Sequence, residues 1–220
     1  DIDGPYAGQK NTEIGALDGQ LNLTGGIDDF SGRFSNNPEM NLQLNTGDND
    51  DGILHINSPI GSSIRNITIG RAANSSETVG RVILGGDNQL GGSTYIDGGS
   101  IGLGDDGNNS RAFGNSVVTI NNSSFIVGAS NLEAGAQILN SINLSSGSTL
   151  NTLGTLSLGG TLSGAGSISV NTGTLSLFGD SNPTWQGTTT VDSGATLTTL
   201  NPELISDSSA LTVNGTVSLG

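Results

Sequence analysis

The feature of the sequence that most constrains its fold is a short pattern that returns about every 20 residues. The pattern reads Gly, any residue, an aliphatic residue, any residue and then Leu, and the copies at Gly80 and Gly194 are looser than the rest. A fixed period of this length is typical of chains that stack many copies of one small structural unit. The copies begin at Gly19, Gly80, Gly99, Gly154, Gly173, Gly194 and Gly215.

A second pattern lies just upstream of several copies, where an aliphatic residue is followed by Asn or Asp. Alternation with period two predicts short strands with aliphatic residues on one face and Ser or Thr on the other. Asn, Asp and Gly tolerate the left-handed backbone that a sharp corner requires. The corner dipeptides are Ile96-Asp97, Val170-Asn171, Val191-Asp192 and Val213-Asn214.

These two patterns predict a chain that bends at regular intervals and winds into coils. Strands of three to five residues are too short to bury an apolar face alone, so each coil must stack on the next. Parallel pairing between coils would bury the inward aliphatic residues as one continuous column, and parallel crossovers favour the right hand. We therefore expect an all-β, right-handed parallel β-helix, a single-stranded solenoid whose coils of about 20 residues each read strand, corner, strand and return.

The whole chain, residues 1–220, is expected to form one segment of a longer solenoid. Residues 1–79 predict looser and more acidic coils with longer corners, such as 45–52, whereas residues 80–220 carry the regular repeat. Helix is expected to be nearly absent. The best helical candidate, Ser130–Gln137, is expected to form an irregular strand or a single turn.

Composition excludes several functional classes. The chain has 20 acidic and 6 basic residues with a net charge of −14, which argues against nucleic acid and anionic lipid as partners. It has no Cys, so disulfides and thiolate metal sites are excluded. Gly, Ser, Asn and Thr make up half of the 220 residues, but the regularly spaced Leu, Ile and Val argue against disorder.

The segment 173–197 resembles the passenger-associated transport repeat, also called the autotransporter-associated β-strand repeat, of bacterial autotransporters. The family pattern is roughly Gly-Thr-Leu-x-Leu-x-Gly, a short stretch with Asn, Thr and an aromatic residue, Gly-x-Thr-x-Val, Asn or Asp, x-Gly, and Leu. Trp185 stands where Tyr is usual, and Pro183 interrupts the pattern. The matching positions are Gly173, Leu175, Leu177, Gly179, Asn182, Trp185, Gly187, Thr188, Thr190, Val191, Asp192, Gly194 and Leu197.

The resemblance extends over about two-thirds of the chain, with residues 81–104 similar to the family's spacer and 144–166 to its lead-in. It implies the passenger domain of a type V secretion system, which is exported unfolded through the outer membrane and folds at the bacterial cell surface. The translocating membrane β-barrel is then expected elsewhere in the same polypeptide. The lack of Cys is consistent with this route, because a periplasmic disulfide would oppose threading.

A serine-protease reading of Gly179-Asp180-Ser181 finds little support. A nucleophilic Ser needs a positioned base, and His55 is the one His in the sequence. Asp180 and Ser181 also fall where the repeat predicts turn residues. His55 alternates with Leu54 and Ile56, which face the other way, so it is expected to point outward into solvent.

Two acidic clusters could offer hard oxygen ligands to Ca²⁺. They are Asp48, Asp50 and Asp51 in one corner and Asp105 and Asp106 in another. Neither has the glycine position of an EF-hand loop, and neither matches the Gly-Gly-x-Gly-x-Asp repeat. Solvated corner residues are the preferred interpretation, and no metal ligand or cofactor is assigned.

Parallel β-helices also include enzymes that act on polysaccharides. A carboxylate pair such as Asp87 and Asp106 is compatible with glycoside hydrolysis, but sugar clefts usually carry aromatic platforms and this chain has one Trp and two Tyr. We therefore predict no enzymatic activity and assign no catalytic residue. The arginines are best explained as solubilising or edge-protecting residues: Arg33, Arg65, Arg71, Arg81 and Arg111.

The Ser-, Thr- and Asn-rich outer faces carry the remaining functional signal. Stacked coils would turn them into ladders of hydroxyls and amides that either bond to another surface or only solvate the rod and bond along their own stack. The first alternative predicts a surface adhesin that binds its own copies, host tissue or matrix, in aggregation and biofilm formation. The others are a passive stalk that presents an effector domain and helps to drive export, and a polysaccharide-acting enzyme. The binding residues stay open.

Overall fold

The computed structural model describes most of the chain from residue 53 onward and three separate stretches before it. For residues 10–16, 20–23 and 40–46, and for Arg65 and Arg71, the backbone alone is described. The described residues are 10–16, 20–23, 40–46, 53–57, 59–61, 64–71, 81–131, 133, 135–179, 184–200, 205 and 210–220.

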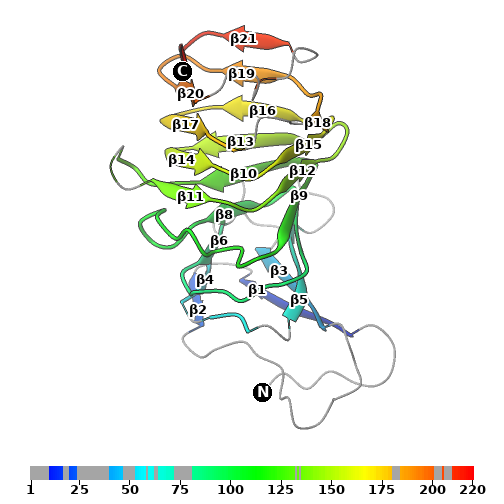
Figure 1. Cartoon of the computed structure of the whole chain (residues 1–220). Coiled ribbons are helices and arrows are strands. Elements are labelled where there is room, and N and C mark those ends of the chain that lie inside the picture. Colours follow the sequence, from blue (N-terminus) through cyan, green and yellow to red (C-terminus); the bar gives the residue numbers. More distant parts are fainter. Residues whose placement is uncertain are drawn as a thin grey trace.

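The described strands form three sheets, and the paired strands of each sheet run parallel (Figure 1). The first sheet contains β1 (Lys10–Ala16), β3 (Met40–Thr46), β5 (Ile64–Arg71), β7 (Ser93–Asp97), β9 (Val117–Asn121), β12 (Ile142–Leu144), β15 (Leu162–Gly164) and β18 (Thr184–Trp185). The second contains β2 (Gln20–Leu23), β4 (Ile53–Ile56), β6 (Arg81–Leu84), β8 (Ser100–Gly102), β10 (Ser123–Val127), β13 (Thr149–Leu153), β16 (Ser167–Val170), β19 (Thr189–Val191) and β21 (Leu211–Val213). The third contains β11 (Ala136–Ile138), β14 (Thr155–Leu158), β17 (Thr174–Leu177), β20 (Thr196–Thr199) and β22 (Thr216–Leu219).

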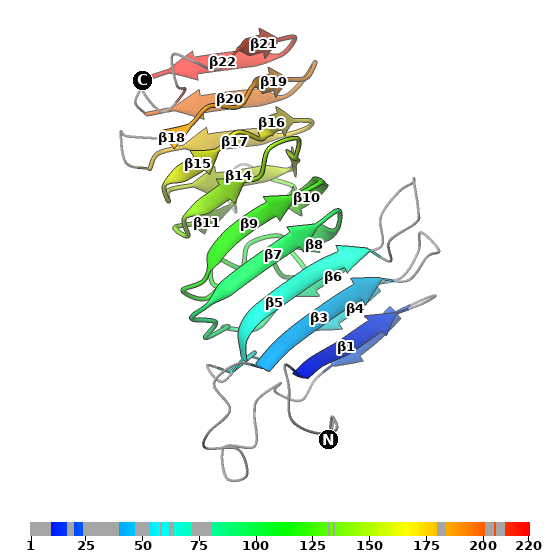
Figure 2. The same cartoon turned by 90° about the vertical axis from the view of Figure 1, so that its right-hand side faces the viewer.

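This arrangement is a parallel β-helix, as the sequence predicts. Successive strands of one sheet come from successive coils, so that strand order follows chain order throughout each sheet. Figure 2 shows the coils stacked along one axis, with the strands near β1 running obliquely and those near β22 closer to level. The described residues contain no helix, and the segment around 130–137 forms bends and a turn before β11 begins.

The coils differ in length along the chain. Thr155, Thr174, Thr196 and Thr216 are register partners, so the last coils are 19, 22 and 20 residues long. Earlier coils are longer, because Ser93 pairs with Val117 and Lys10 with Met40. The sequence predicts two strands per coil, but from β11 onward a third strand is present. Before β11, the described residues of the third side, 57, 59–61, 85–92 and 103–116, form irregular turns and one isolated bridge position.

Inward aliphatic side chains form one hydrophobic core that continues from coil to coil. In the second sheet, Leu54, Val82, Ile101 and Ile126 follow one another in register, and all are buried. The first and third sheets contribute similar columns. The apolar side chains of β21 and the end of β22 are exposed, since no further coil covers them within the described residues.

The segment 173–197 begins at the turn before β17 and runs through β18 and β19 into β20. Its aliphatic positions Leu175, Leu177, Val191 and Leu197 all lie in the core. Trp185 is fully buried and donates its indole N–H to the Gly166 carbonyl over 2.7 Å. The described residues of the motif therefore supply strands of all three sheets of the β-helix.

The polar corners also lie where the sequence places them. Asn171 donates its side-chain amide to Asp192 in the next coil, and Asn122 donates its amide to Asp97 in the preceding coil. Asn122 is the non-glycine residue with a positive φ, 55°, among the described residues, in a conformation that Asn tolerates. These contacts form short polar ladders along the corners of the solenoid.

Candidate functional site: the irregular side and the polar faces

Side-chain amides replace strand pairing on the third side of the coils that precede β11. Asn88 is buried, and its Oδ1 accepts from the Ile60 N–H while its Nδ2 donates to the Ala112 carbonyl, each over 2.8 Å. One side chain thus connects three successive coils. Asn140 connects two coils, because its amide donates to the carbonyls of Gly114 and Ser116 in the preceding coil.

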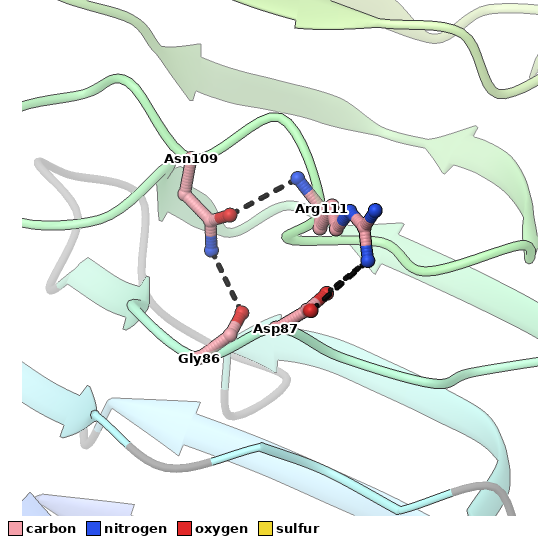
Figure 3. Close-up of polar contacts among 4 residues, drawn as sticks. All are labelled: Gly86, Asp87, Asn109 and Arg111. Carbon is pink, nitrogen blue, oxygen red and sulfur yellow. Dashed lines mark hydrogen bonds and ion pairs between the residues drawn. The ribbon is translucent and has the colours of Figure 1, made fainter.

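Asn109 and Arg111 form a second connection, shown in Figure 3. The Asn109 amide donates to the carbonyls of Leu84 and Gly86, at 2.7 and 2.9 Å, and its Oδ1 accepts from the Arg111 N–H. The Arg111 guanidinium contacts both carboxylate oxygens of Asp87 at 3.0–3.1 Å. Both side chains are largely exposed, so this ion pair contributes about 0–1 kcal/mol to stability. Arg111 therefore contacts the preceding coil in addition to its expected solubilising role.

The expectation that His55 is a solvated residue is wrong. Its side chain does face away from the core, but it is 9% exposed and contacts Asp105. Asp105 lies just after β8, two coils further along the solenoid than β4, and its carboxylate reaches His55 on the outer face of the second sheet. The contact therefore connects β4 to the segment 103–116. The sequence could not show this, because the contact joins residues fifty positions apart.

The other candidate chemical residues do not form a reactive group within the described part of the chain. Asp87 is paired with Arg111, and Asp106 accepts a hydrogen bond from the Asn108 backbone N–H. Arg81 is exposed, and its aliphatic stem packs where a Cβ on Gly102 would lie. Among the described residues, no three His, Cys, Asp or Glu side chains lie together as a group that could hold a metal ion. The candidates Arg33, Asp48, Asp50, Asp51, Asp180 and Ser181 lie outside the described residues, as do the side chains of Arg65 and Arg71.

The third sheet has a regular polar surface from β14 onward. Its inward residues are buried aliphatics in β14 and β17, and the intervening residues face outward. The outward positions form two columns of hydroxyl side chains that follow the coil register. The columns are Thr174, Thr196 and Thr216, which continue in register from the buried Thr155, and Ser157, Ser176, Thr198 and Ser218.

A third, apolar column borders these hydroxyls and was missed in the sequence. It consists of Leu139, Phe178 and Leu200, each directly after a strand, with Gly159 between the first two. Leu139 is 65% exposed and Leu200 is 70% exposed. The sequence does contain a pattern that predicts this column, because an aliphatic or aromatic residue breaks the alternation just after the last inward position of β11, β17 and β20. We call the hydroxyl columns and this apolar column together the hydroxyl face.

Comparison with known proteins gives no family assignment. No family model matches the sequence, and no curated protein and no solved structure matched it. In the part of the chain that the structure describes, no helix has the length and apolar character needed to cross a membrane.

Proposed function

We propose that this chain is a segment of a bacterial autotransporter passenger that acts without catalysis in adhesion and self-association at the cell surface. The motif at 173–197 and the repeat around it support the secretion assignment. The proposed partner is another copy of the protein, with host tissue or matrix as the alternative adhesive target.

The observation that carries the adhesive role is the in-register stacking of polar outer faces over successive coils. Each coil of the third sheet from β17 onward adds a pair of hydroxyl positions to the same two columns. A hydroxyl both donates and accepts, so that many weak hydrogen bonds, each worth about 0.5–1.5 kcal/mol net, can form at once with a second polar surface. A rigid rod holds these groups in place before contact, which lowers the entropic cost of binding.

A surface-display experiment tests this function. The 220-residue chain would be fused to a translocating β-barrel in a bacterium that does not aggregate, with the barrel alone as the control. We expect displayed cells to settle faster from suspension and to be retained on abiotic or matrix-coated surfaces. Settling and retention equal to those of the control, with the chain shown to be at the surface by antibody labelling, would refute adhesion.

A passive stalk is the second candidate, and the unbroken core favours it. Buried residues from Leu54 to Leu197 belong to one hydrophobic cluster, as expected of a stiff spacer. Displayed cells that neither clump nor attach, but that present an appended epitope far from the membrane, would favour the stalk over the adhesin.

A further inference from the structure

We propose that the hydroxyl face pairs with the same face of a second copy of this chain. This inference rests on the proposed function of self-association and specifies which surface performs it. The two copies would meet face to face about a two-fold axis, with the hydroxyl columns and the apolar column both inside the contact.

The hydroxyl columns form a regular two-dimensional array. Along a strand the two columns are about 6.6 Å apart, and from coil to coil their members are about 4.8 Å apart. Because successive coils pair in register, the spacing is the same at every step. An array of this kind fits a partner with the same repeat, and a second copy has that repeat by construction.

Among the described residues, these hydroxyls have no hydrogen-bond partner. Elsewhere, polar side chains on outer faces and corners bond to one another, as Ser167 does with Thr188 and Ser145 with Asn121. The outward hydroxyls of β14, β17, β20 and β22 make no hydrogen bond to another described residue. Their donors and acceptors therefore remain open to solvent or to a partner.

The apolar column supplies a hydrophobic contribution that a purely solvated ladder would lack. A Cβ placed on Gly159 would lie 2.4 Å from the Phe178 ring and 2.8 Å from Leu139 Cδ2. These two side chains therefore close over the glycine and make the column continuous across that coil. Leu200 extends it into the next coil. Large exposed apolar side chains aligned on one face, next to polar groups, are typical of a protein contact surface.

Charge favours a second copy over a charged partner. The described residues of the hydroxyl face carry no ionisable side chain, although the chain has a net charge of −14. A basic partner would find no carboxylate among them to bind. Two copies that meet through this face bring neutral surfaces together, while carboxylates such as Asp87, Asp97 and Asp105 lie at corners outside it.

Sedimentation velocity of the purified chain over a range of concentrations tests the proposal. We expect a monomer–dimer equilibrium, because a two-fold contact closes once two copies have met. One variant pair, Leu139→Ser with Leu200→Ser, removes exposed apolar groups that do not support the core. A second pair, Ser176→Glu with Thr198→Glu, places like charges in the contact. We expect each pair to weaken dimerisation by about tenfold or more.

The matched control is Thr119→Glu with Asn143→Glu, which adds the same charge to the outer face of the first sheet. We expect this control to dimerise like the parent chain, and circular dichroism should show that all variants retain their strand content. Loss of association in the control alone, or equal association in all variants, would overturn the choice of face but leave self-association standing. Open-ended oligomers would also overturn it, since contact through the exposed edges of β21 and β22 grows without closing. A parent chain that stays monomeric, and whose displayed cells do not aggregate, would refute both this inference and the self-association on which it rests.

Discussion

Thr94 in β7 of the first sheet and Thr199 in β20 of the third sheet are both buried but differ in their hydrogen bonding. Both are 0% exposed. The Thr94 hydroxyl lies 2.7 Å from the Ser116 hydroxyl and bonds with it, whereas the Thr199 hydroxyl has no hydrogen-bond partner in the part of the chain that is described. Thr199 lies in register between Leu177 and Leu219, both aliphatic.

Replacing each Thr by Val should therefore change stability in opposite directions. A buried hydroxyl without a partner costs about 1–3 kcal/mol, so Thr199→Val should raise the free energy of unfolding by about 1–2 kcal/mol. Thr94→Val removes a net contribution of about 0.5–1.5 kcal/mol and should lower it by about 1 kcal/mol. In a chain of this size, 1 kcal/mol corresponds to about 2–4 °C in the thermal midpoint.

Urea denaturation followed by two probes measures both effects. Trp185 is the one tryptophan and lies in the same coil as Thr199, so its fluorescence reports on the region where Thr199→Val acts. Far-UV circular dichroism reports on the whole solenoid and serves for Thr94→Val. Because a substitution in a repeat protein acts mainly on its own coil and the adjacent ones, the fluorescence midpoint should respond more strongly to Thr199→Val.

Thr198→Val is the matched control, because Thr198 is adjacent to Thr199 but faces outward. Its hydroxyl is already accessible to water, so we expect a change within about 0.5 kcal/mol. A lower fluorescence midpoint for Thr199→Val, or an equal shift for Thr198→Val, would show that the unpaired buried hydroxyl does not determine stability at this position.

Three further predictions concern other structural features. Asn88→Ala should lower the free energy of unfolding by about 2–4 kcal/mol, because it leaves the Ile60 N–H and the Ala112 carbonyl without their partner. Urea denaturation would measure this change, and a loss below about 0.5 kcal/mol would contradict the role of Asn88 as a connection between coils. Gly164→Ala should prevent stable folding of its coil, since the added Cβ would lie 2.1 Å from the Leu144 carbonyl oxygen. Gly194→Ala adds only the strain of a positive φ, about 1–2 kcal/mol, so equal thermal midpoints for the two variants would refute the role of this close approach. His55→Ala and Asp105→Ala should each speed amide hydrogen exchange within residues 103–116 and leave exchange in β14 and β17 unchanged. If residues 103–116 of the variants exchange as slowly as those of the parent chain, the contact does not stabilise this segment.

Much of the core can be read from the sequence alone. The repeated aliphatic positions, such as Leu156, Leu175 and Leu197, become one buried column because a fixed period places equivalent residues above one another. The corner positions Asp97, Asn171 and Asp192 follow from the same period, since a bend at each interval needs residues that tolerate it.

The irregular side could not be predicted in the same way. Asn88 connects residues 28 positions before it and 24 after it, and no local pattern distinguishes this Asn from the others in the chain. The third strand from β11 onward does not follow from the sequence pattern either. Gly-Thr-Leu-Ser-Leu at 154–158 and 173–177 predicts strands, but the pattern does not show that these strands form a separate side of the coil.

The sequence by itself determined that the chain winds, where it bends and which residues are inside, because these depend on period and polarity along the chain. Only the tertiary structure decided which outward residues are truly exposed. His55 alternates as an outward residue but is only 9% exposed and contacts Asp105 from two coils further along, whereas Leu139 and Leu200 are apolar but exposed. Exposure depends on what lies above a residue in space, and the spacing of residues along one strand does not contain that information.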